Sequence, residues 1–138
     1  MARVNARVKT LLIMSDKEKL YEILGELLFV VAKADGVIQV EEKEVLESYF
    51  KDHPYGEDIR WSFNYEAKRN TPVDDVYNKV IDYCKHYGPT NEYQEFIKAM
   101  EVVAEAADGI DENETAVMQS FSQDLLTRFK NDIDAMQS

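Results

Sequence analysis

Apolar residues recur at three- and four-residue intervals through most of this 138-residue chain, and no stretch alternates strictly enough to predict a β-strand. Only five glycines and three prolines interrupt a chain of this length. One domain of this size can bury about two-thirds of its unfolded surface. The pattern therefore predicts an all-α protein, with residues 1–138 forming a single compact bundle of about six to seven helices.

Start and stop signals place the expected helices. Ser15 and Glu18 form a predicted capping box that opens the first long helix, which ends at Gly36. A second helix carries the apolar set Val45, Leu46, Tyr49 and Phe50 and stops before residue 54. An aromatic-rich helix is expected over 54–69, and a helix that starts with Thr71 as its cap and Pro72 at its first position follows it. Gly88 ends that helix, and two further helices cover 93–107 and about 117–129, while a short amphipathic helix precedes residue 15.

An internal repeat relates residues 20–50 to residues 93–122. At an offset of 73 positions the apolar residues of the first copy fall on apolar residues of the second, and beyond the turn the offset becomes 72. The pairs before the turn are Leu20 with Tyr93, Ile23 with Phe96, Leu24 with Ile97, Leu27 with Met100, and Val30 with Val103. We therefore expect two related helical hairpins, which usually pack around a pseudo-twofold axis.

Both copies contain an Ala-Asp-Gly turn followed by a glutamate, "ADGVIQVEE" at 34–42 and "ADGIDENE" at 107–114. The spacing resembles the second half of an EF-hand loop, but the positions of the first ligands are Val31 and Lys33 in the first copy. A complete EF-hand is therefore excluded. One half-loop has too few oxygen atoms for a divalent cation, and two half-loops together would supply more, with calcium as the expected ion. The candidate metal ligands are Asp35, Glu42, Asp108, Asp111 and Glu114.

The same residues have a second interpretation as helix caps. Glu42 follows Gln39 by three positions, and Glu114 follows Asp111 by three, which is the capping-box spacing. The aspartates of the two turns can accept backbone hydrogen bonds. The sequence leaves capping and cation binding open.

The two turns, "VAKADGVIQVEEKEVL" at 31–46 and "VAEAADGIDENETAVM" at 103–118, resemble the TerB-like family, which includes tellurite-resistance proteins and the N-terminal region of DjlA co-chaperones. The resemblance covers roughly residues 20–129. It implies a helical domain with pseudo-symmetric hairpins, a metal-binding acidic cluster, and a role in stress response or in complexes peripherally associated with membranes. The second copy departs from the motif by a one-residue deletion, which rotates Glu114 relative to Asp108.

Net charge, hydropathy and cysteine content limit the expected partners and the expected location of the protein. The formal net charge of −11 argues against nucleic acid and anionic membrane surfaces, and favours cations and basic protein partners. The apolar runs are too short for an integral membrane protein, and we expect no signal peptide. Cys84 is the only cysteine, which fits a cytoplasmic location, and its place on an apolar stripe predicts a core residue.

The segment 55–65 gives the alternative function. It contains Trp61, Phe63 and Tyr65, and such aromatic residues form either a core or a binding surface. No nucleophile elbow or phosphate loop is present, so we expect no enzyme activity. The first expected function is a non-catalytic stress-response module that binds a divalent cation, and the alternative is a metal-free adaptor that binds proteins through a groove around Trp61.

Overall fold

The structure is a computed structural model that describes residues 15–34, 36–88, 90–106, 112–113, 115–117 and 119–121. Five helices have defined bounds: α2 (Asp16–Lys33), α3 (Val40–Tyr49), α4 (Gly56–Arg69), α5 (Val73–Tyr87) and α6 (Glu92–Ala104). The described residues of 112–121 are also helical, and none of the described residues lies in a strand. The predicted all-α class is confirmed. The short helix expected before residue 15 lies outside the described residues.

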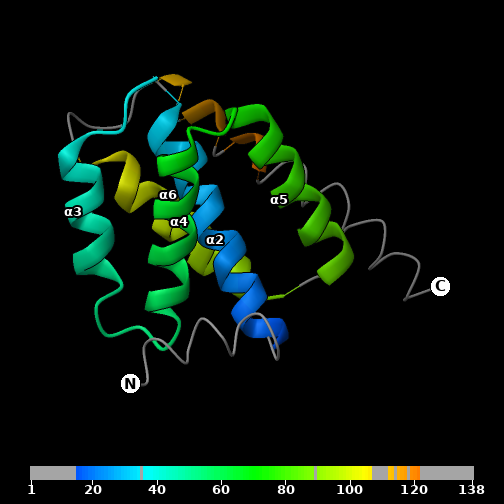
Figure 1. Cartoon of the computed structure of the whole chain (residues 1–138). Helices are drawn as coiled ribbons and strands as arrows, with labels where there is room; N and C mark the ends of the chain where they lie inside the picture. The colour runs from blue at the N-terminus through cyan, green and yellow to red at the C-terminus, as the bar shows by residue number, and fades with distance from the viewer. Residues whose placement is uncertain are drawn as a thin grey trace.

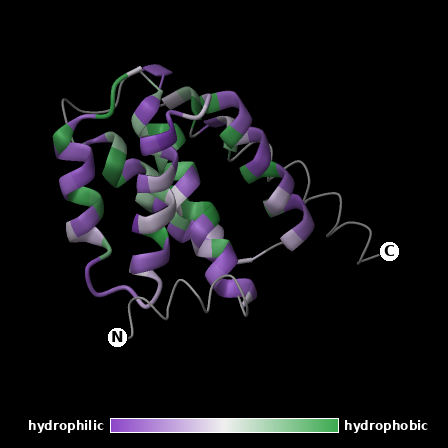
Figure 2. Ribbon diagram, viewed as in Figure 1, coloured by the Kyte–Doolittle hydropathy of each residue, from purple (hydrophilic) through white to green (hydrophobic). Residues whose placement is uncertain are grey.

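Helix α2 is the centre of the bundle, with α4, α5 and α6 packed against it and α3 beside α6 (Figure 1). Every residue of the run 27–32 is buried, so α2 is covered on nearly all sides. Figure 2 shows hydrophobic and hydrophilic residues alternating along the helices, as expected of amphipathic helices around a core. Such a central helix has few positions where a charged side chain can reach water.

Four of the five apolar pairs that the repeat defines before the turn are buried in both copies, while Ile97, the partner of Leu24, is only half-buried. Leu20, Leu27 and Val30 on α2 are buried, and so are their repeat partners Tyr93, Met100 and Val103 on α6. The two helices pack against each other. The rest of the second hairpin lies largely outside the described residues, so the pseudo-symmetry of the hairpins stays a prediction.

The predicted capping box at the start of α2 is confirmed, whereas the helix ends at Lys33, before the predicted end at Gly36. The Ser15 hydroxyl accepts a hydrogen bond from the Glu18 amide, and the Glu18 carboxylate accepts one from the Ser15 amide, each at 3.1 Å. After the helix, Gly36 has a φ of +100°. A side chain would be strained in this conformation, and the sequence supplies glycine.

Two further local predictions differ from the structure in detail. Helix α5 begins one residue later than expected, because Pro72 occupies the capping position and the Thr71 hydroxyl donates to Glu66 instead of capping the helix. Of the apolar set predicted for the second helix, Leu46 on α3 and Phe50 at its C-terminal cap are buried, but Tyr49 is 43% exposed. The core contacts only one narrow side of this helix. Leu46 and Phe50, four residues apart, lie on that side, and Tyr49 does not.

Candidate functional site

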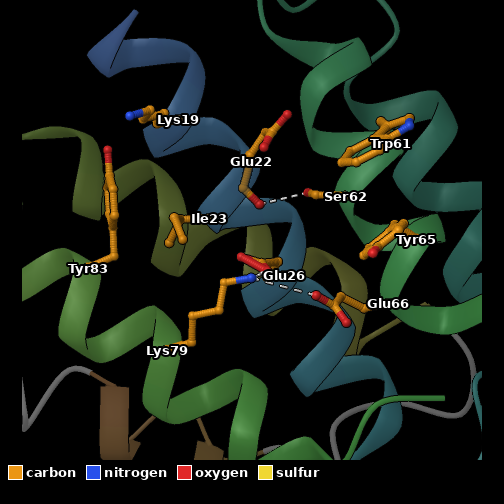
Figure 3. Close-up of a pocket in the computed structure, with 10 residues that line it drawn as sticks. All are labelled: Lys19, Glu22, Ile23, Glu26, Trp61, Ser62, Tyr65, Glu66, Lys79 and Tyr83. Carbon is orange, nitrogen blue, oxygen red and sulfur yellow. Dashed lines mark hydrogen bonds and ion pairs between the residues drawn. The ribbon is translucent and has the colours of Figure 1, made fainter. Parts of the chain in front are cut away.

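A hollow of about 350 Å³ lies where α2, α4 and α5 meet (Figure 3). We call it the Trp61 groove. Its lining residues are Lys19, Glu22, Ile23 and Glu26 from α2, Trp61, Ser62, Tyr65 and Glu66 from α4, and Lys79 and Tyr83 from α5. A second hollow of about 540 Å³ beside α3 is lined by polar and charged side chains, namely Glu44, Glu47, Ser48, Lys51 and Arg60. Of these two hollows, the Trp61 groove is the one that combines aromatic rings with buried carboxyl groups.

Two carboxyl groups lie buried in the Trp61 groove, where α2 faces α4. Glu26 is 5% exposed and Glu66 is 4% exposed. The Lys79 Nζ atom lies 2.5 Å from Glu26 Oε2 and 3.9 Å from Glu66 Oε2. Thr71 donates its hydroxyl to the other Glu66 oxygen, Oε1, at 2.6 Å. The ammonium group of one lysine on α5 therefore forms ion pairs with both carboxyl groups (Figure 3).

Burial raises the pKa of Glu26 to about 7, because its surroundings solvate a carboxylate poorly. The hydrogen bond and charge of Lys79 oppose this rise, and the neighbouring Glu66 adds to it. The single lysine thus compensates only part of the cost of burying this carboxylate beside another.

An aromatic wall flanks the buried carboxyl groups. Trp61 is 40% exposed and Tyr65 is 42% exposed, and their rings stack with centroids 5.1 Å apart and planes at 14°. The Arg69 guanidinium lies 5.2 Å from the centre of the Tyr65 ring and donates to the Tyr65 hydroxyl at 2.7 Å. Phe63, from the same segment, is fully buried. The aromatic segment therefore divides, with Phe63 in the core and Trp61 with Tyr65 at the surface.

Of the five predicted metal ligands, Glu42 is the one that the described residues include. Its Oε1 atom accepts a hydrogen bond from the Gln39 amide at 2.7 Å, and the residue is 1% exposed. The capping interpretation of Glu42 is therefore confirmed at the start of α3.

The other candidates, Asp35, Asp108, Asp111 and Glu114, lie outside the described residues. Within the part of the chain that the structure describes, no group of three or more His, Cys, Asp or Glu residues is arranged to hold a metal ion. The divalent-cation site, and calcium as its ion, stay predictions.

A second polar cluster joins the α3–α4 connection to α2 and α6. The Tyr55 amide donates to His53 Nδ1 at 2.9 Å, so the ring proton is on Nε2, which lies 2.8 Å from Glu95 Oε2. The Tyr21 hydroxyl donates to Glu95 Oε1 at 2.5 Å. Burial raises the pKa of Tyr21, and the bond to Glu95 raises it further, so the phenol stays a donor. This cluster links three segments of the fold through satisfied polar groups.

Cys84 is fully buried, and burial raises the pKa of its thiol to about 12. The prediction that it belongs to the core is confirmed. No described helix is long and apolar enough to cross a lipid bilayer.

Glu26, Glu66 and Lys79 were not among the residues predicted from the sequence. One signal for Glu26 was available, because it directly precedes the uninterrupted apolar run 27–32. A charged residue inside the most apolar helix of a chain needs a counter-ion, but periodicity does not say which residue supplies it.

The chain matches no protein-family model, no curated protein and no solved structure. Membership of the TerB-like family, with its stress-response role, is therefore still a prediction from the two Asp-Gly turns.

Proposed function

We propose that this chain is a non-catalytic module that binds a basic segment of a partner protein in the Trp61 groove. The observation that carries the proposal is the stacked, exposed pair Trp61 and Tyr65 beside the buried carboxyl groups of Glu26 and Glu66. This corresponds to the adaptor alternative predicted from the sequence, with the partner's chemistry added.

Charge and ring chemistry favour a basic partner. The net charge of −11 attracts positively charged segments over the whole surface, and exposed aromatic rings supply large contact areas at little entropic cost. Ring faces also attract ammonium and guanidinium groups. Arg69 already lies against Tyr65 in this way, which supports the affinity of this wall for cations.

The proposal is tested with a fluorescein-labelled decapeptide of alternating lysine and serine, whose binding is followed by anisotropy. Trp61→Ala should weaken binding by about tenfold, equal to ~1.4 kcal/mol. The matched control is Tyr49→Ala, because Tyr49 is an equally exposed aromatic residue on α3, outside the groove. Its affinity should change by less than about twofold.

Both variants keep the net charge, so general attraction between the acidic surface and the peptide is the same in each. Equal affinities for Trp61→Ala and the parent chain would overturn the proposal, and so would equal losses in both variants. Thermal unfolding checks the fold. If Trp61→Ala does not fold, Trp61→Leu, which keeps apolar volume but removes the ring face, replaces it.

A further inference from the structure

The buried carboxyl groups need the Lys79 ammonium more than the ammonium needs them. Glu26 and Glu66 are nearly inaccessible to water, so the carboxylates depend on partners within the protein. Lys79 lies beside both, and the Thr71 hydroxyl also donates to Glu66. The Lys79 side chain is 60% exposed, so its ammonium group is already partly hydrated. Moving Nζ fully into water therefore costs the lysine little, whereas the carboxylates need a replacement.

The Trp61 groove could also bind a lysine side chain from another protein next to Glu26 and Glu66. The aliphatic stem of a lysine packs readily on apolar surface while its ammonium group reaches a polar partner. In the groove, the exposed rings of Trp61 and Tyr65 form such a surface on the same helix as Glu66 (Figure 3). The groove thus provides both parts of a lysine-binding site.

We propose that the partner's basic segment inserts one lysine side chain between the Trp61 wall and the Glu26–Glu66 pair, where it replaces the Lys79 ammonium. Lys79 is then a built-in competitor that occupies the site when no partner is bound. This inference rests on the proposed function, because it names the group that the groove binds.

The test compares Lys79→Met with Lys85→Met in titrations with the unlabelled lysine–serine decapeptide at pH 8. Lys85 is an exposed lysine on the same helix that does not line the groove, so both variants remove one positive charge from α5. Trp61 is the only tryptophan, so its fluorescence reports binding at this groove. In the parent chain most of the Glu26 carboxyl groups are ionised at pH 8, because their pKa is about 7 while Lys79 is present. Loss of the Lys79 charge raises this pKa, so Lys79→Met is titrated at pH 9 as well.

We expect Lys79→Met to bind the peptide about five- to tenfold more tightly than the parent chain, and Lys85→Met to differ by less than twofold. Equal gains in both variants would show an effect of net charge alone and overturn the inference. An unchanged affinity in Lys79→Met would also overturn it, because the ammonium would then not compete.

Glu66→Gln in the parent chain gives an independent check if Lys79→Met does not fold. It should weaken peptide binding by about tenfold, while Glu47→Gln on α3 should have little effect. Equal effects of these two variants would overturn the inference. If peptide binding requires Trp61 but is unaffected by the substitutions at Lys79 and Glu66, the proposed function holds and the lysine site is overturned. If neither the parent chain nor any variant binds the peptide, both are overturned.

Discussion

Glu26 has a carboxyl group whose ionisation the fold opposes. Its ordinary pKa of 4.5 rises to about 7, chiefly because the residue is buried. The folded chain therefore holds a proton between pH 4.5 and 7 that the unfolded chain has released. This contribution to stability is fully present below pH 4.5 and is lost as the pH rises through 7.

Glu26→Gln should remove this pH dependence, because glutamine keeps the size and polarity of the side chain without titrating. Between pH 5 and pH 8 the parent chain should lose up to about 3 kcal/mol more unfolding free energy than the variant. Urea unfolding at both pH values measures the difference. Parallel pH profiles for the two proteins would contradict the assignment of the raised pKa to Glu26.

Substitutions at Glu42 can distinguish helix capping from metal binding. Its carboxylate accepts the Gln39 amide at the start of α3, so Glu42→Ala should destabilise the protein by about 1 kcal/mol in the presence of EDTA. Glu42→Gln should retain most of the stability, because a glutamine oxygen also accepts at this position. A loss in Glu42→Ala that appears only when calcium is present would favour metal binding over capping.

At the scale of elements, the crossing of α2 and α4 depends on a glycine. A Cβ atom on Gly25 would lie 2.0 Å from Ser62 Oγ and 2.2 Å from the Ile59 carbonyl oxygen. The Ser62 hydroxyl also donates to the Glu22 carbonyl at 2.7 Å, which ties the two helices together at this point. The same crossing places Glu26 opposite Glu66 and so forms the floor of the Trp61 groove.

Gly25→Ala should destabilise the protein by about 2 kcal/mol or more, measured by urea unfolding. Alanine gains about 1 kcal/mol of helix propensity, but the contact with a backbone oxygen forces the helices apart and costs more. Gly36→Ala is the comparison, because the space around Gly36 is open and only its positive φ opposes a side chain. Its cost should be about 1 kcal/mol, and a larger loss there than at Gly25 would contradict the close crossing.

At the scale of the whole molecule, the predicted calcium site would join the two Asp-Gly turns of the repeat. Calcium at about 100 times its dissociation constant should then raise the melting temperature by about 5–10 °C. Sodium chloride of equal ionic strength is the control, since salt alone screens repulsion in a chain with a net charge of −11. An equal rise in both salts, or a calcium effect that survives Asp35→Asn with Asp108→Asn, would remove the predicted site.

Local chemistry explains which features could be predicted from the sequence. The capping boxes at Ser15 and at Gln39 join residues three positions apart, and the positive φ of Gly36 is a property of one residue. Helical periodicity likewise needs only a few turns of chain. The sequence leaves the division of the aromatic segment open, because whether Trp61 or Phe63 meets the core depends on the position of α2.

The sequence by itself determined the all-α class, the approximate bounds of the helices and the acidic net charge, because these follow from contacts within a turn or from composition. The tertiary structure alone decided that Glu26, Glu66 and Lys79 meet, since they come from three helices and no local pattern relates them. A carboxylate depends on a neighbouring cation only when packing removes its water, and packing is a property of the assembled bundle.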